Sequence, residues 1–222
     1  MQTKLIAYTV PQIEATGVGR TYSALSPEEF IVYIARVSNP SNQQNLKTGA
    51  KLLKYLIEHK HWSPFEHVSC TFEIKTSRAI AAQILRHRSF TFQEFSQRYA
   101  EVTEVENIEW REQGKTNRQV GDEPMYIDRD LNDEVRNVIA TSKAVYGKLI
   151  KAGVAKECAR MVLPLSTSTT IYMTGTLRSW IHYLDLRCSE HTQKEHRDIA
   201  LDIKKRLEKT FPETFKVLNE KD

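Results

Sequence analysis

The segment RHRSFTFQEFSQR, residues 86–98, holds the densest polar chemistry of the chain. Within thirteen positions it places three guanidiniums, an imidazole, a carboxylate and a hydroxyl, from Arg86, Arg88, Arg98, His87, Glu94 and Ser96. Guanidiniums repel one another, so a cluster of them usually has anions among it, and phosphate oxygens accept bidentate hydrogen bonds from the planar fork. The segment therefore indicates a phosphate or nucleotide site. A solvated basic turn is the alternative that composition alone leaves open.

Aromatic side chains interrupt these charges at Phe90, Phe92, Phe95 and Tyr99. Large rings lie against a core or a planar ligand, so the segment cannot be a free basic tail. We expect the basic groups to be held on a framework of packed rings.

The composition is that of an ordinary globular protein. The chain has 222 residues, of which 40% are hydrophobic, enough for one sizeable core, and we expect a single domain over residues 1–222. The net charge of +4, from 32 basic and 28 acidic residues, is too small for a protein that coats nucleic acid and suits small anionic ligands better.

The cysteines argue against a disulfide framework. Cys70, Cys158 and Cys188 are odd in number, far apart and without a CxxC pair, which also disfavours a zinc ribbon. No stretch approaches the roughly 18 apolar residues of a membrane span. We therefore expect a soluble protein of the cytoplasm, or of the host cytoplasm if the source is viral.

Hydrophobic periodicity alternates between strand and helix without internal repeats, which predicts a mixed α+β fold. Strands are expected over residues 4–10, 67–76 and 167–174. Helices are expected over residues 26–36, 49–60, 77–88, 132–151, 155–163, 176–187 and 190–209. The segment 107–130 has no period and contains Gly114, Gly121 and Pro124, so we expect a long surface loop or lid there.

Two of these helices carry polar side chains beside their apolar stripes. In helix 77–88 the spacing turns Ile80, Ile84 and Leu85 inward and places Gln83, Arg86 and His87 on one face. In helix 176–187, Arg178 and His182 share the face opposite the buried residues.

Residues 86–98 also resemble the Arg-His-Arg, seven residues, Ser signature of the flavin-dependent thymidylate synthases. Further blocks follow in that family's order at 35–38, 61–67, 159–160, 163–165 and 186–187. The resemblance implies a twisted antiparallel sheet flanked by helices, in a homotetramer whose active sites are shared between subunits. It also implies reductive methylation of dUMP to dTMP. The one-carbon unit comes from 5,10-methylenetetrahydrofolate, which leaves as tetrahydrofolate, and the hydride comes from FAD that NADPH has reduced.

The resemblance assigns site residues position by position. Those implied to bind dUMP are Gln83, Arg86, Glu94, Phe95, Ser96, Gln97, Arg98, Arg160 and Arg187. Those implied to bind FAD are Ser63, Arg86, His87, Arg88, Glu94, Thr176, Leu177, Arg178 and His182, of which Thr176 and His182 stand where family members often or sometimes have Asn. Arg187 is implied to be catalytic, because a guanidinium against O2 and N3 of uracil stabilises negative charge drawn onto the ring.

The cysteines also bear on the chemistry. Ordinary thymidylate synthase activates C5 of uracil by adding a cysteine thiolate to C6. Here Cys70 alternates into a strand interior, Cys158 lies in a short helix, and Cys188 lacks the preceding proline of that catalytic segment. A buried structural thiol is the commoner fate of such residues, and a flavin removes the need for one.

Other interpretations remain open. A non-catalytic nucleotide- or RNA-binding module would explain residues 86–98, but not the second cluster of Arg160, Arg178 and Arg187. A hydrolase that uses Cys188 and His191 would explain neither cluster. Ser96 is a weaker candidate for a nucleophile than for a phosphate-binding hydroxyl, since a nucleophile needs a base and an oxyanion site.

Neither a metal nor a dedicated nicotinamide domain is expected. His191, Glu195 and His196 lack HExxH spacing and a third ligand. There is no GxGxxG loop and no Walker lysine loop, so NADPH would have to use the flavin pocket.

Overall fold

The architecture is built around an antiparallel sheet. A computed structural model describes residues 2–13, 25–102, 104–117 and 119–220. Its four strands follow the order β1-β2-β6-β3 and are β1 (Gln2–Tyr8), β2 (Ser69–Ser77), β6 (Ser168–Thr176) and β3 (Thr91–Glu94). Every neighbouring pair is antiparallel. The predicted α+β fold with an antiparallel sheet is confirmed.

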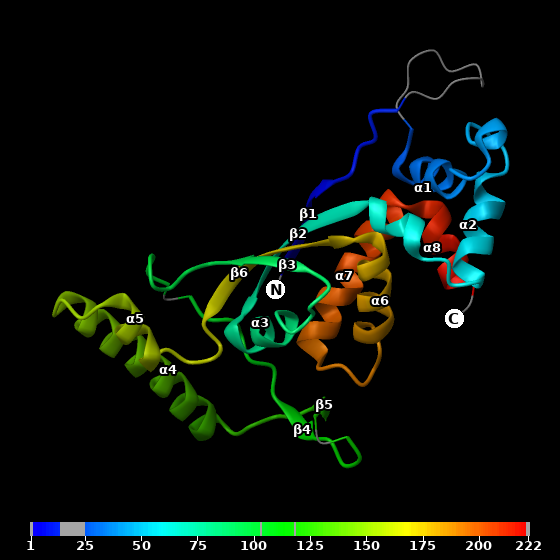
Figure 1. Cartoon of the computed structure of the whole chain (residues 1–222). Coiled ribbons are helices and arrows are strands. Elements are labelled where there is room, and N and C mark those ends of the chain that lie inside the picture. The colour runs from blue at the N-terminus through cyan, green and yellow to red at the C-terminus, as the bar shows by residue number, and fades with distance from the viewer. Residues whose placement is uncertain (1, 14–24, 103, 118, 221–222) are drawn as a thin grey trace.

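One face of this sheet carries the core. Successive residues of a strand point to opposite faces, and Phe72, Ile74 and Ile171 of the core face are fully buried. Figure 1 shows that α3 (Arg78–Ile84), α6 (Leu177–Arg187) and α7 (Lys194–Thr210) lie on one side of the sheet. The opposite face, which includes Lys75 and Tyr172, is open to solvent.

Smaller helices gather at one end of the sheet. They are α1 (Pro27–Ala35), η1 (Pro40–Asn42), α2 (Gly49–Glu58), η2 (Ser63–His67) and α8 (Pro212–Asn219). The buried Glu28 carboxylate of α1 accepts hydrogen bonds from the backbone N–H of Glu213, at 3.3 Å, and of Thr214, at 2.6 Å, in the first turn of α8. A carboxylate on those free N–H groups also suits the positive end of the helix dipole.

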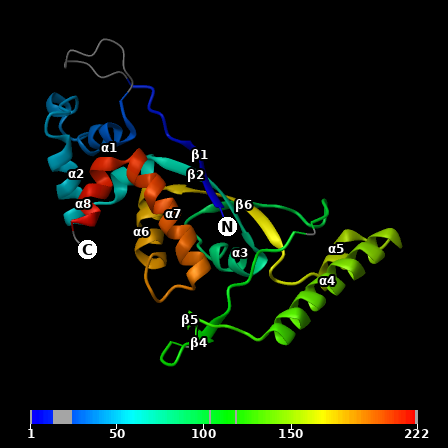
Figure 2. The same ribbon diagram turned by 180° about the vertical axis from the view of Figure 1, so that it is seen from behind.

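An arm projects from the other end of the sheet (Figures 1 and 2). It consists of α4 (Arg129–Lys151), α5 (Lys156–Ala159) and η3 (Arg160–Val162). A hairpin of β4 (Arg111–Gln113) and β5 (Gly121–Pro124) precedes it. Within the described residues, no helix is long and apolar enough to cross a membrane.

Local capping signals account for the helix ends that the sequence predicted well. Ser26 caps α1 in a capping box with Glu29, as its pattern of Ser, Pro and two acids predicts. Gly153, with φ of +81°, follows the C-cap of α4, where a left-handed residue favours glycine.

The expected helix 77–88 is wrong in its last four residues, 85–88. The helix α3 ends at Ile84, and Leu85 is 36% exposed rather than buried. Arg86 and His87 therefore lie in a turn, and Gln83, Arg86 and His87 do not share a helix face. The reason is tertiary: the Phe90 ring packs edge-on against Trp180, with ring centroids 4.7 Å apart, and draws the chain into β3.

Other expectations also need correction. The segment 107–130 contains the β4–β5 hairpin, and the last expected helix begins at Lys194 rather than at residue 190. Residues 155–163 form α5 and η3 in place of one helix, and β3 and α8 were not predicted. Tyr99 is 86% exposed, so it does not join the packed rings.

Candidate active site

The end of α6 meets the turn after α3 in a specific polar contact. Arg187 is the last residue of α6, and its Nε donates a hydrogen bond to Nε2 of His87 over 2.9 Å. The His87 ring is held edge-on by Tyr183, with ring centroids 4.9 Å apart, and by Phe90, at 6.4 Å. Packed aromatic rings thus fix the imidazole, and the imidazole orients the guanidinium.

The protonation state of His87 follows from this packing. Burial and then the positive charge of Arg187 lower the pKa of His87 to about 4. At neutral pH the ring is therefore uncharged, and its Nε2 is free to accept from Arg187. Nη1 and Nη2 of Arg187 have no hydrogen-bond or ion-pair partner among the described residues, so they remain open to a ligand.

Gln83 lies in the same group, on the side of α7. Its Nε2 donates to Oε1 of Gln193 over 2.6 Å. Its Oε1 lies 3.4 Å from Nδ1 of His196, whose side chain is fully buried. Gln83, His87 and Arg187, predicted separately from the sequence, therefore lie together on the helix-covered side of the sheet.

A second group begins on β3. Oε1 of Glu94 accepts from Arg78 at 2.6 Å and from Thr169 Oγ1 at 3.0 Å. In the turn that follows, Ser96 is exposed, whereas Gln97 is only 6% exposed and its Nε2 is buried without a hydrogen-bond partner. A buried amide donor of this kind is costly unless a ligand accepts from it.

The Ser96 hydroxyl has no catalytic surroundings. No histidine or carboxylate in the described ranges forms a hydrogen bond with it. Glu94, the nearest acid in sequence, is already committed to Arg78 and Thr169. The arrangement fits a binding hydroxyl better than a nucleophile.

A third group surrounds η2 and the start of α6. Arg178 forms an ion pair with Glu66, and His182 lies edge-on to Trp62, with ring centroids 5.3 Å apart. Arg178 thus contacts η2, to which the exposed Ser63 belongs, and His182 contacts the residue just before it.

The two residues before Arg178 are engaged in the fold. The Thr176 hydroxyl caps α6 by accepting from the Ser179 N–H over 3.3 Å. The Leu177 side chain is fully buried, and its N–H donates to the Val68 carbonyl over 2.7 Å. Their contribution to the fold is to hold Arg178 at the helix start.

Several predicted guanidiniums have no acidic partner. Among the residues for which the structure gives side chains, no carboxylate pairs with Arg86, Arg88, Arg98 or Arg160. The first three are exposed. Arg160 lies apart from the other site residues, in η3 of the arm. Unpaired guanidiniums at this density retain their full capacity to bind anions.

The cysteines offer no activated thiolate in the core. Cys70 is 1% exposed, and burial raises its pKa to about 12. Cys158 is exposed and Cys188 is half-buried. In the described ranges, no group of three or more His, Cys, Asp or Glu side chains is arranged to hold a metal ion.

Known proteins resemble this chain over nearly its whole length. A family model described as thymidylate synthase complementing protein matches residues 21–213. A probable flavin-dependent thymidylate synthase of Paramecium bursaria Chlorella virus 1 is 50% identical over 222 residues, which cover 99% of each protein. A flavin-dependent thymidylate synthase of Synechocystis sp. is 48% identical over 214 residues, 96% of each protein. This chain belongs to the flavin-dependent thymidylate synthase family.

A solved structure supports the same fold. The UMP/dUMP methylase PolB from Streptomyces cacaoi, bound with 5-Br dUMP, matches with a TM-score of 0.79 at 25% identity. The match covers 99% of this chain and 94% of that chain. The resemblance inferred from residues 86–98 is confirmed.

Sequence reasoning for this flavin-dependent thymidylate synthase missed the partners of its site residues. Tyr183, Gln193 and His196 contact predicted residues, yet they come from helix faces that read as ordinary core or helix start. Glu195 and His196 were considered only as metal ligands. No periodic pattern in the sequence identifies these residues as part of the site, because their partners are more than 80 residues away in sequence or on another helix.

Proposed function

We propose that this protein methylates dUMP reductively to dTMP, with 5,10-methylenetetrahydrofolate as the one-carbon donor and NADPH-reduced FAD as the hydride source. The observation that carries the proposal is the Arg187–His87 pair, in which a neutral imidazole orients a guanidinium whose Nη1 and Nη2 have no partner among the described residues. A site built only to bind phosphate has no need of an arginine oriented by a neutral imidazole.

The residues present fit a flavin dinucleotide. Arg86 and Arg88 are exposed guanidiniums without carboxylate partners in the described part of the chain, which suits a diphosphate. Ser63, His87, Glu94, Thr176, Leu177, Arg178 and His182 complete the proposed FAD set. When bound, FAD supplies the hydride. The reaction then needs no cysteine thiolate, and the buried Cys70, with a pKa of about 12, could not provide one at neutral pH.

The proposed nucleotide set combines charge with hydrogen bonding. Arg86 and Arg98 would bind the phosphate of dUMP, the Ser96 hydroxyl would donate to it, and the buried Nε2 of Gln97 would find an acceptor there. Gln83, Glu94, Phe95 and Arg160 complete the set with Arg187.

Arg187 is the proposed catalytic residue. The neutral His87 ring fixes Nε of Arg187, so Nη1 and Nη2 face the ligand without searching among rotamers. Against O2 and N3 of uracil they would stabilise negative charge that develops on the ring as C5 becomes nucleophilic. His87 orients Arg187 and does not supply a proton at neutral pH, because its pKa is about 4.

We further propose that each active site contains residues of two copies of the chain. Phe95 and Ser96 line a shallow groove on the open face of the sheet with Lys75 and Tyr172, whereas His87 packs against α6 on the covered face. Residues on opposite faces of a sheet cannot enclose one small nucleotide from within one protomer. A second copy resolves this.

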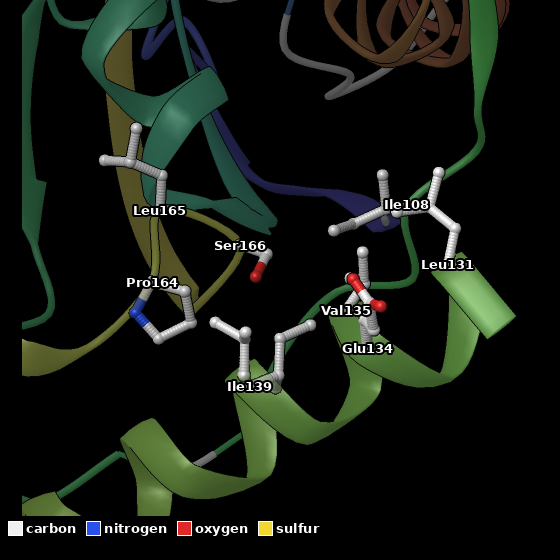
Figure 3. A pocket seen from close by; sticks show the side chains of 9 residues that line it. Ile108, Leu131, Glu134, Val135, Ile139, Pro164, Leu165 and Ser166 are labelled. Carbon is white, nitrogen blue, oxygen red and sulfur yellow. The ribbon is translucent and has the colours of Figure 1, made fainter.

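The arm offers an apolar surface for such an assembly. A groove runs between α4 and the Pro164–Ser166 segment, and Figure 3 shows Ile108, Val135 and Ile139 along it, with Leu165 at its edge. Leu165 is 73% exposed and Val138, which also lines the groove, 67%. Exposed apolar surface of this kind marks an interaction site. This groove supports the proposed homotetramer. We propose that its subunits are single-domain chains of 222 residues and that the protein acts in the cytoplasm.

The function is tested by the visible absorbance of the purified protein after FAD is added. Under anaerobic conditions, NADPH should bleach the flavin, and dUMP with 5,10-methylenetetrahydrofolate should restore its colour with dTMP formed. A protein that neither holds flavin nor responds to NADPH would be the non-catalytic nucleotide-binding module.

A further inference from the structure

A chain of hydrogen bonds connects the β4–β5 hairpin to the active site. Nη2 of Arg111, on β4, donates to Oε1 of Glu195 over 2.5 Å. Nε2 of Gln193 donates to Oε2 of Glu195 over 2.9 Å. Nε2 of Gln83 in turn donates to Oε1 of Gln193 over 2.6 Å.

The chain continues beyond Gln83 into the core. Oε1 of Gln83 lies 3.4 Å from Nδ1 of His196, and Nε2 of His196 lies 3.0 Å from the Tyr183 hydroxyl. The His196 and Tyr183 side chains are 0% and 2% exposed. The rings of both approach His87, which accepts from Arg187.

The Glu195 carboxylate, at one end of this hydrogen-bond network, determines which group donates and which accepts in every bond of the network. An ionised carboxylate can only accept hydrogen bonds, so Gln193 must turn its NH₂ toward Glu195 and its oxygen toward Gln83. Gln83 must then donate to Gln193 and turn its own oxygen toward His196. That leaves Nδ1 of His196 as the donor and Nε2 as the acceptor from Tyr183. Reversing either amide would place two donors or two acceptors face to face, which is costly in a buried network.

We propose that Glu195 is a positioning residue: its carboxylate, held by Arg111, fixes the orientation of the Gln83 carboxamide, and with it the remaining Nε2 hydrogen and Oε1 lone pair that Gln83 can offer to the nucleotide. The inference rests on the proposed function, in which Gln83 binds dUMP. It gives the β4–β5 hairpin a role in substrate recognition, because Arg111 anchors the chain from β4.

The surroundings of Glu195 keep it ionised. Its side chain is 19% exposed and that of Arg111 is 12% exposed. Burial alone would raise the pKa of Glu195, but the hydrogen bonds from Arg111 and Gln193 hold it below its ordinary value. Glu109 and Lys194 are close to the pair, with Glu109 3.9 Å from Arg111 and 3.0 Å from Lys194.

The test is the Glu195→Gln variant. The new side chain has the same shape and can still accept hydrogen bonds, but it can also donate them. The donor and acceptor roles of Gln193 and Gln83 are then no longer fixed. The matched control is Asp198→Asn, one turn along α7, which removes the same charge from a carboxylate that pairs with Lys194 and does not touch the chain. The readouts for each flavin-loaded protein are the dUMP dissociation constant by calorimetry, the flavin content and the melting temperature.

We expect Glu195→Gln to weaken dUMP binding about tenfold, with flavin content and melting temperature near those of the wild type. Asp198→Asn should bind dUMP as the wild type does. In a Gln83→Ala background, Glu195→Gln should weaken binding no further, since the group it positions is gone. Gln193→Met, which breaks the chain one link closer to Gln83 and spares the ion pair, should give a similar loss if Glu195→Gln folds poorly.

Equal dUMP affinity of the Glu195→Gln and Asp198→Asn variants would overturn this inference but leave the proposed function intact. The same would follow if Glu195→Gln weakened dUMP binding as much in the Gln83→Ala background as in the wild type. Wild-type protein that binds no dUMP would overturn the proposed function and the inference with it.

Discussion

The shape of the guanidinium at position 187 is the first property to test. Arg187→Lys keeps the charge but replaces a planar fork with a point charge, and loses the Nε that donates to His87. We expect dTMP formation to slow about 100-fold, as removal of one oriented donor does elsewhere, with flavin binding unchanged. Steady-state rates at saturating dUMP measure this. A rate within twofold of the wild type would show that Arg187 does not stabilise the reacting ring.

Two histidines whose pKa values are lowered, the half-buried His87 and the fully buried His196, predict how stability depends on pH. Burial and then the charge of Arg187 lower the pKa of His87 to about 4 and that of His196 to about 3. The unfolded chain binds protons at these rings near pH 6.5, while the folded chain does not until far lower pH. Their stabilising contribution is therefore present above about pH 6.5 and is lost as the pH falls toward 4.

Urea unfolding at pH 7 and pH 5 measures this effect. For His196, which is fully buried, the loss should be on the order of 1 to 2 kcal/mol between those values. A His196→Gln variant should be less stable at pH 7 but should lose less between pH 7 and pH 5. The same pH dependence in wild type and variant would show that His196 does not cause it.

For single residues, the sequence supplied the candidate site residues but not the contacts between them. Residues 86–98 and Arg187 could be assigned because their chemistry is dense and their spacing resembles a family signature. The Arg187–His87 and Gln83–Gln193 contacts join residues 100 and 110 positions apart. Such contacts depend on helix packing, which no local pattern encodes.

Gly175 of β6 packs closely against Phe90, which lies in the turn before β3. A Cβ on Gly175 would lie 2.4 Å from Cδ1 of Phe90, and the Phe90 ring is held by Trp180 and Tyr183. Gly175→Ala should therefore push Phe90 out and cost about 1 to 3 kcal/mol. It should also weaken dUMP binding, because His87 lies only three residues before Phe90.

The matched control for that variant is Gly147→Ala. Gly147 lies in α4 with no atom within 4 Å of its added Cβ, so the change should be neutral or raise stability by up to about 1 kcal/mol. Thermal melts and dUMP titrations of both variants measure the difference. Equal behaviour of the two would show that the Gly175–Phe90 contact does not position the site.

Elements with strong local signals were predicted, and elements decided by distant contacts were not. The α1 helix carries its own capping box and could be placed within a residue or so. The α3 helix was extended too far because a helical pattern continues past Ile84, where the burial of Phe90 prevails. The four-residue strand β3 is too short to show a period, and it forms because β6 offers it a paired edge.

At the scale of the whole molecule, we propose that the active site depends on assembly of several copies of the chain. If each site takes Arg187 from one copy and Arg98 from another, Arg187→Ala and Arg98→Ala should each be inactive alone. Mixed oligomers should recover activity, because one site of each mixed pair contains neither change. In a symmetric pair, the purified mixed oligomer should recover about half of the wild-type activity, and the unfractionated product of random pairing about a quarter.

Co-expression of the two variants under different affinity tags, followed by assays of the doubly purified oligomer, measures the recovery. Monomeric protein in analytical ultracentrifugation, or mixed oligomers as inactive as their parents, would place the whole site within one chain. The family resemblance implies sites shared between subunits, but the residues alone do not show that Ser96 and His87 lie on opposite faces of the sheet.

The central claim is that this chain forms dTMP with a flavin and without a cysteine nucleophile. The most direct measurement is dTMP formation from dUMP by FAD-loaded protein in which Cys70→Ala, Cys158→Ser and Cys188→Ser are combined, with NADPH and 5,10-methylenetetrahydrofolate supplied. We expect dTMP at a rate near that of the wild type, and none without FAD. Folded, flavin-loaded variant protein that forms no dTMP, or wild-type protein that forms it without flavin, would contradict the claim.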